Sequence, residues 1–278
     1  TQDQAIGWTQ PRGEENGAMI ESVGGQWIAK WVVEKKDIPA SVVNRKLAKR
    51  MAEIEEREGR RVGRAEKKEL KEEIRFDLLP HAFPKIKNVW VWIDPVANLL
   101  EIDSTSQAHA DMIVTALVDA SPGFAVHMLR TNTNACAAMA HWLHTHEAPE
   151  DFSIDRETEL QACDESKAVV RYANHPLDIA EIREHIDQGK LPVKLAMTFD
   201  DRVSFVLTDG LQLRGIEFLD AVAEDHKTDD AGFDADVAIA TGELRALLPA
   251  LVQSLGGEPD AEAATKAAPL PSMPSDAA

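Results

Sequence analysis

The chain contains 278 residues, 44% of them hydrophobic, which allows a substantial core divided between two or three compact units. Its 48 acidic residues outnumber the 30 basic ones, and the formal net charge of −18 at pH 7 opposes binding of a polyanion such as DNA over most of the surface. No apolar run approaches the roughly 20 residues that a membrane-spanning helix needs, and the N-terminus lacks a signal-peptide pattern, so we expect a cytoplasmic protein with no membrane partner.

The basic residues are concentrated in one stretch of the sequence. The 61 residues from Lys30 to Trp90 hold 17 of the 30 Lys and Arg residues and only 11 of the 48 Asp and Glu residues. This basic window therefore has a formal charge of +6, whereas the remainder of the chain has −24. A polyanion would be repelled by most of the protein and attracted to this window.

The first part of the chain is predicted to be a sheet interrupted by two helices. Alternating apolar residues around Gly24 and Gly25 indicate a β-hairpin, because glycine tolerates the positive φ of a tight turn. Apolar residues then recur every three or four positions, which predicts one helix at 39–59 and a second at 64–79. Strand chemistry returns at 87–103, so we expect the two helices to form a hairpin that projects from a sheet.

The remainder of the chain is predicted to be a meander of short strands with helices before, between and after them. Turn pairs such as Asp200-Asp201 and Asp209-Gly210 separate the runs of alternating apolar residues. The expected strands lie at 168–173, 192–199, 202–208, 211–218 and 236–240. The expected helices lie at 105–119, at 133–145, at 178–188, and from an N-cap at Thr241 along a leucine-rich face to Gly256-Gly257.

These elements define an α+β protein with four parts. We expect a central strand-rich body built from residues 1–37 and 84–130, with a helical finger inserted at 38–83. A second α+β unit, the base, should occupy 131–257. The residues after Glu258 are rich in Ala, Pro and Ser, so 258–278 are expected to be a disordered tail.

Basic residues of the two predicted helices are candidate phosphate ligands. On the first helix they form two pairs spaced four apart, which places two positive stripes beside the apolar one. Arginines crowd the turn between the helices, and a guanidinium group can donate two hydrogen bonds to phosphate at any relevant pH. The candidates are Arg45, Lys46, Lys49, Arg50, Arg57, Arg60, Arg61 and Arg64.

The same pattern is also typical of a solvated helix pair held by local ion pairs. Glutamates are interleaved with the basic residues, and we expect them to pair above all with Lys67, Lys68 and Lys71. The stretch from Arg45 to Arg50 and the arginines of the turn would then be the freer charge. From the residues alone, the structural and the phosphate-binding interpretations both stay open.

The sequence contains no strong motif for binding a metal or a cofactor. His141, His144 and His146 form an H-x-x-H-x-H string, but this spacing matches no established metal site. Cys136 and Cys163 have no second cysteine nearby, and we expect both to be reduced core residues. We therefore predict no metal site and no cofactor.

The sequence also lacks the common catalytic motifs. There is no G-x-S-x-G elbow, no phosphate-binding G-x-x-x-x-G-K-[ST] loop and no dinucleotide fingerprint, so we predict no catalytic residues. A metal-dependent nuclease is an alternative, because four aspartates lie at predicted strand or turn ends. Turn aspartates that bond their own backbone explain these positions more simply. The four residues are Asp94, Asp103, Asp234 and Asp236.

A series of short motifs, in order and covering nearly the whole chain to about Gly257, resembles the bacterial recombination-associated protein RdgC family. Each motif alone is weak, but their joint order and spacing are specific. The motifs are Gly7-Trp8 with Pro11, Gly-Gln-Trp-Ile at 25–28, Leu-Leu-Pro-His-Ala-Phe at 78–83, Val-Trp-Ile-Asp at 91–94, Gly-Lys-Leu at 189–191, and Phe-Asp-Ala-Asp with Thr-Gly-Glu-Leu within 233–244.

This resemblance implies a non-enzymatic protein that binds double-stranded DNA independently of its sequence. Members of the family form a ring-shaped homodimer around the duplex, associate with the nucleoid and restrain the RecA recombinase. The helical finger closes the ring, so the resemblance implies a dimer contact at Phe83, for which a core phenylalanine is the alternative. It also implies a DNA contact at His81, where the family often has Arg.

Two departures from the family pattern bear on these expectations. The family begins with a further strand-rich segment of roughly three dozen residues, so we expect that residues preceding Thr1 are absent from this sequence. Ala173, Asn174 and His175 replace a polar or basic patch, and fewer fixed charges imply weaker DNA binding. A competing hypothesis is an acidic interaction protein that acts on the recombinase itself, with the basic finger serving only dimerisation.

Overall fold

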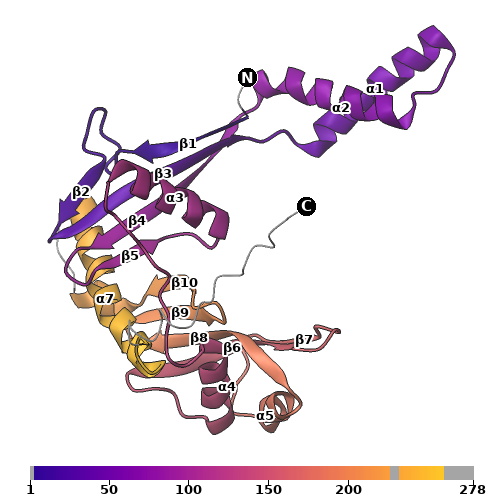
Figure 1. The fold of residues 1–278 in the computed structure, drawn as a ribbon. Helices are drawn as coiled ribbons and strands as arrows, with labels where there is room; N and C mark the ends of the chain where they lie inside the picture. The colour runs from indigo at the N-terminus through magenta and orange to yellow at the C-terminus, as the bar shows by residue number, and fades with distance from the viewer. Residues whose placement is uncertain (1–2, 226–231, 260–278) are drawn as a thin grey trace, which may run out of the picture. The chain divides into compact units, whose positions relative to one another are not determined.

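The computed structural model describes residues 3–225 and 232–259, which belong to two compact units divided between Phe124 and Ala125. Each unit contains one antiparallel five-stranded sheet with helices, so the expected α+β class is confirmed (Figure 1). No helix within the described ranges is long and apolar enough to cross a membrane. The tail expected at 258–278 lies almost entirely outside the described residues.

The sheet of the first unit has the strand order β1-β3-β4-β5, and β2 also pairs with β3. Its β2–β3 connection confirms the predicted hairpin, and the turn glycines Gly24 and Gly25 have φ of 58° and 83°, which other residues rarely adopt. β1 is absent from the prediction because its six residues include a glycine and show little alternation. The strands are β1 (Gln4–Thr9), β2 (Ile20–Val23), β3 (Gln26–Lys36), β4 (Pro84–Asp94) and β5 (Leu99–Ile102).

One face of this sheet forms the core of the first unit. Cross-strand partners share a face, and the register Ala29↔Val91 and Trp31↔Val89 brings apolar side chains together there. Helix α3 (Gln107–Ala120) adds Ile113, which is completely buried in the same cluster. The core ends at Val33, beyond which the strands carry lysines.

Two helices are inserted between β3 and β4, as predicted. They are α1 (Ala40–Glu58) and α2 (Arg64–Leu78), followed by the short 3-10 helix η1 (Leu79–His81). Gly59 ends α1 in the left-handed conformation, and its amide donates to the Glu55 carbonyl at 2.9 Å. The two helices pack through a small cluster made of Val43, Leu47 and Ile74. We call residues 40–78 the helical hairpin.

The second unit has a sheet of order β10-β9-β8-β6-β7. Its core combines aromatic and aliphatic residues of the sheet with residues of α4, α5 and α7, and it includes Phe205, Leu195 and Leu247. The strands are β6 (Phe152–Ala162), β7 (Val169–Tyr172), β8 (Lys190–Phe199), β9 (Val203–Thr208) and β10 (Leu213–Phe218). The helices are α4 (Ala135–Thr145), α5 (Ala180–Asp187), α6 (Asp220–Asp225) and α7 (Phe233–Ser254).

The strand predicted at 236–240 is wrong, because α7 begins at Phe233 and continues through this segment. Thr241 is not the N-cap but an internal residue, whose hydroxyl donates to the Val237 carbonyl at 2.8 Å. The alternation of Val237 and Ile239 is too short to compete with a 22-residue helix that buries Leu247 and Leu251.

Strand β6 is missing from the prediction for a different reason. Its pairing with β8 shifts register between Ile154 and Thr158 and again between Glu159 and Leu160. Each bulge changes which residues point to the core, so the apolar alternation that identifies a strand is broken. The predicted division into body, finger and base stays a prediction.

Candidate nucleic-acid interface

The helical hairpin exposes all eight predicted phosphate ligands. Four of them lie on α1 and are exposed: Arg45, Lys46, Lys49 and Arg50. The four arginines from Arg57 to Arg64 around the turn are also exposed. Because their stems need no burial for the fold, these side chains are sterically available to an anion, and the question is which of them already has an acidic partner.

Two turn arginines are engaged by glutamates of the same hairpin. Arg60 donates through Nη1 and Nη2 to the two carboxylate oxygens of Glu66 at 2.7 and 2.8 Å, and it also pairs with Glu58 at 2.8 Å. Arg57 pairs with Glu58 at 2.7 Å. The hydrogen bond from Arg60 lowers the pKa of Glu66, and the bonds from Arg57 and Arg60 lower the pKa of Glu58. On α1, Arg50 also lies 3.8 Å from the Glu53 carboxylate. The expectation that the stretch from Arg45 to Arg50 and the turn arginines are the freer charge is therefore wrong for Arg50, Arg57 and Arg60.

The lysines of α2 show the opposite behaviour. We expected Lys67, Lys68 and Lys71 to pair with glutamates, but in the described part of the chain no ion pair involves them. The reason is helical spacing: neither Lys67 nor Lys71 has an acidic residue three or four positions away, where a pair could form. Counting acidic residues in the sequence overlooked this geometry.

Four basic residues of α2 recur at spacings of four, three and four and so share one face of the helix. All four are exposed, and Glu72 is the one acidic residue of α2 that stands three or four positions from any of them. Like charges at this spacing oppose helix formation slightly, so the fold does not explain the pattern. We call this set the α2 stripe, and it consists of Arg64, Lys68, Lys71 and Arg75.

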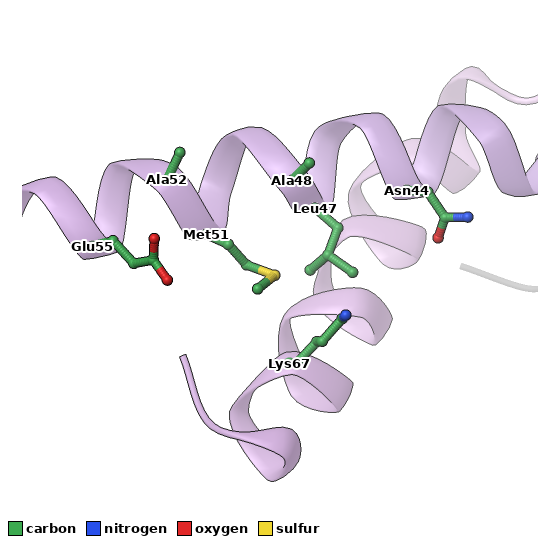
Figure 2. Close-up of a pocket in the computed structure, with 7 residues that line it drawn as sticks. All are labelled: Asn44, Leu47, Ala48, Met51, Ala52, Glu55 and Lys67. Atoms are coloured by element: carbon green, nitrogen blue, oxygen red, sulfur yellow. The ribbon is translucent and has the colours of Figure 1, made fainter. Parts of the chain in front are cut away.

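A groove of about 520 Å³ runs between α1 and α2. Leu47 and Met51 reach from α1 toward α2, and Lys67 of α2 extends toward them, as Figure 2 shows. The apolar stem of a lysine can cover such a floor while its ammonium group stays in water. Lys67 is thus placed beside the groove rather than on the α2 stripe.

Large apolar side chains are exposed in the last turn of α2 and in the segment that follows it. Phe83 is 88% exposed, which rules out the alternative of a core phenylalanine within this chain. Phe76 and Ile86 are 61% and 64% exposed. His81, the predicted DNA contact in this segment, is exposed at the end of η1.

Two histidines of the H-x-x-H-x-H string, His144 and His146, contact residues of α5. His144 Nε2 lies 3.3 Å from the Asp187 carboxylate, and Arg183 donates to His146 Nε2 at 3.0 Å. Across the described ranges no group of three or more His, Cys, Asp or Glu side chains could hold a metal ion. These histidines therefore have structural partners between two helices.

The positions of the cysteines and of three of the four candidate aspartates need no metal or catalytic role to explain them. Both cysteines are free thiols, but Cys163 is exposed and Cys136 is only partly buried, so neither is the fully buried core residue that was expected. Asp94 accepts hydrogen bonds from the amides of Val96 and Ala97 at 2.9 and 3.0 Å, which confirms its role in a turn. Asp234 and Asp236 are in the first turn of α7, where a negative charge favours the helix.

Comparison with known proteins gives a consistent result over nearly the whole chain. A family model described as "RdgC: Putative exonuclease, RdgC" matches residues 1–258. The chain is 43% identical over 259 residues to the recombination-associated protein RdgC of Cupriavidus pinatubonensis, and 42% identical over the same length to that of Bordetella pertussis. It is 44% identical to the corresponding protein of Cupriavidus necator. Each of these matches covers 92% of this chain and 86% of the relative.

Proposed function

We propose, from the premise that the chain belongs to the RdgC family, that this protein binds double-stranded DNA without sequence preference by encircling it as a homodimer. It acts without catalysis, restrains recombination by RecA and resides on the nucleoid. The relatives named recombination-associated proteins support a role in recombination. The DNA-binding mechanism rests on this chain's own charges.

The observation that carries the proposal is the set of exposed cations on the helical hairpin that lack acidic partners. An acidic protein of net charge −18 binds a polyanion only if its positive charge is segregated and available. The α2 stripe, with Lys46 and Lys49 on α1, meets both conditions within the basic window. Lysine and arginine contacts to phosphates carry no sequence information, which supports binding to any duplex.

A ring requires that two copies meet, and the segment after α2 supplies a suitable surface. Phe83 is an aromatic side chain that the single chain leaves almost fully in water, and burying it against a partner would stabilise a dimer by roughly 1.5 to 3 kcal/mol. Phe83 is therefore our candidate for the contact that closes the ring.

Two measurements on DNA test the proposal. Affinity for a short duplex should fall steeply with salt and depend little on base sequence, because phosphate binding releases counterions. A closed ring cannot leave a covalently closed circle by sliding off an end, so dissociation after a salt challenge should be slower from a circle than from a linear duplex of equal length. A salt-independent affinity, or equal retention on both forms, contradicts the proposal.

A strand-exchange assay distinguishes this proposal from the alternative in which the acidic surface acts on the recombinase. In a variant with charge reversal at Arg45, Lys46, Lys49 and Arg50, both DNA binding and inhibition of RecA should be lost. If the variant still inhibits strand exchange, the acidic surface acts on the recombinase and the hairpin serves dimerisation alone.

The word exonuclease in the description of the family model calls for a separate test. Labelled linear and circular DNA should stay intact when the protein is incubated with Mg²⁺, Mn²⁺ or Zn²⁺. Support for this expectation is that Asp94 accepts hydrogen bonds from a turn and that Asp234 and Asp236 lie in the first turn of α7. Release of nucleotides from DNA ends by the purified protein would establish an enzyme instead.

A further inference from the structure

Half of the positive excess of the basic window lies outside the helical hairpin. Residues 40–78 carry 12 basic and 9 acidic side chains, whereas the flanking residues 30–39 and 79–90 together carry 5 basic and 2 acidic ones. Both parts therefore have a formal charge of +3, although the flanking part is shorter. The flanking segments, whose basic residues are the lysines of β3 and β4, contribute as much net charge as the helical hairpin.

The strand register brings three of these lysines onto one face of the sheet. Lys35 on β3 is the direct partner of Lys85 on β4, and Val33 is the direct partner of Lys87. Direct partners in an antiparallel pair have Cβ atoms about 5 Å apart, and diagonal neighbours lie about 7 Å apart. We call Lys35, Lys85 and Lys87 the root patch, because it lies where the helical hairpin joins the sheet.

The root patch is open to solvent and only partly neutralised. It continues the face that carries the core cluster, but the buried residues end at Val33 and Val89, and all three lysines are exposed. Lys85 Nζ lies 2.6 Å from the Asp37 carboxylate, and this bond lowers the pKa of Asp37. Within the described residues no ion pair involves Lys35 or Lys87.

Apart from the exposed ion pair of Lys85 with Asp37, this arrangement of charge does not help the fold. Like charges directly opposite each other in a sheet are destabilising, so the Lys35 and Lys85 pair costs stability. One structural explanation is edge protection, because β5 pairs only with Val91–Asp94 and leaves the first half of β4 without a neighbour on that side. Lysines discourage such an edge from pairing with another chain. That explanation does not apply to Lys35, which lies on a strand paired on both sides.

We infer that the root patch is a second phosphate-binding site of this protein, which takes the sugar-phosphate backbone of a nucleic acid. Lysine ammonium groups are flexible point charges that neutralise phosphates without fixed geometry, and each can donate up to three hydrogen bonds. Contacts from lysines to phosphates carry no sequence information, so a patch made of lysines suits the backbone and not the bases. The inference rests on the proposed function and extends the DNA contact from the hairpin to the sheet.

The test compares three double variants by their salt dependence. Lys35→Gln with Lys87→Gln removes two charges from the root patch and keeps the Lys85 and Asp37 pair. Arg156→Gln with Lys167→Gln removes two exposed charges from the second unit as the matched control. Lys68→Gln with Lys71→Gln reports on the α2 stripe. Affinity for a blunt-ended duplex is measured between about 50 and 200 mM salt, where phosphate contacts dominate the salt slope.

The root-patch variant should lower the salt slope by up to about 1.8, since each phosphate contact contributes about 0.9, and it should fold as well as the parent. The control should leave the slope unchanged. If the slope is unchanged in the root-patch variant but reduced in the α2 variant, the root patch is not a phosphate-binding site. DNA binding through the helical hairpin would then still be supported. If the root-patch variant associates with itself and its salt slope is unchanged, the lysines protect the edge of β4 and do not bind phosphate. If the parent itself shows no salt slope, the proposed function has failed.

Discussion

The turn of the helical hairpin and the α2 stripe contain the same kinds of residue but differ in what those residues can bind. At the turn, Arg57 and Arg60 are held by Glu58 and Glu66 at hydrogen-bond distances. Along the stripe, Lys71 has no acidic residue in helical reach. The number of basic residues therefore does not locate a phosphate site, because only the charges left open by the fold are available to a ligand.

The largest expected effect comes from the α2 stripe. Changing Lys68 and Lys71 to Gln should weaken duplex binding roughly 10- to 100-fold near physiological salt and lower the salt slope by about 1.8, because two phosphate contacts are lost. Glutamine has nearly the helix propensity of lysine, so the melting temperature should not fall. Binding can be followed by fluorescence anisotropy on duplexes of two unrelated sequences. Loss of affinity for only one of them would contradict backbone recognition.

Phe83 extends the comparison from charged to apolar groups. Changing it to Ala should abolish the longer retention on circular DNA and shift the protein toward monomer in sedimentation, because the ring contact is removed. The stability of the single chain should change by less than about 0.5 kcal/mol, as for other exposed positions, whereas truncating a core phenylalanine costs about 3 to 5 kcal/mol. A large loss of stability with intact dimer would therefore count against the interface.

Glu101 is a buried acidic residue, and changing it should affect the stability of the protein. Burial raises its pKa to about 8, and its Oε1 atom is buried with no hydrogen-bond partner among the described residues. The folded protein then holds a proton that the unfolded chain has released, so the free energy of unfolding should fall by about 1.4 kcal/mol per pH unit between about pH 5 and 8. Changing Glu101 to Gln should flatten this dependence in thermal melts and raise the melting temperature at pH 8. An unchanged pH profile would show that Glu101 is solvated.

The smallest effect is expected at the turn. Replacing Arg60 and Glu66 together by Gln removes an ion pair without changing the net charge, and affinity for the duplex should stay within about twofold of the parent. The pair is exposed, so its contribution to stability is screened and the melting temperature should change little. A loss of affinity comparable to that of the α2 variant would show that the turn contacts DNA despite its glutamates.

The sequence was a good guide where local signals decide the structure. Gly24 and Gly25 identified the β2–β3 hairpin, and apolar spacing ended by Gly59 identified α1. It failed at β6, where bulges break the alternation, and at 236–240, where a short alternating run belongs to a long helix. In both places the pairing of distant segments decides the outcome.

The position of the candidate site stays a prediction, and the structure changes which of its residues are available. The basic window and the family resemblance placed it on the hairpin, and the family is confirmed over residues 1–258. Which cations have partners depends on side-chain geometry, so Arg60 was taken as free and Lys71 as paired. The opposition of Lys35 and Lys85 depends on the register of strands separated by the entire helical hairpin, which charge counts along the chain do not reveal.

The central claim is that open cations of the hairpin and its root bind the DNA backbone. The most direct measurement is lysine acetylation, followed by mass spectrometry, of the intact protein with and without duplex DNA. The account predicts that Lys68, Lys71, Lys35 and Lys87 become protected on binding while Lys167 of the second unit reacts as before. Equal reactivity at Lys68 and Lys71 with and without bound DNA, or protection confined to the second unit, would contradict it.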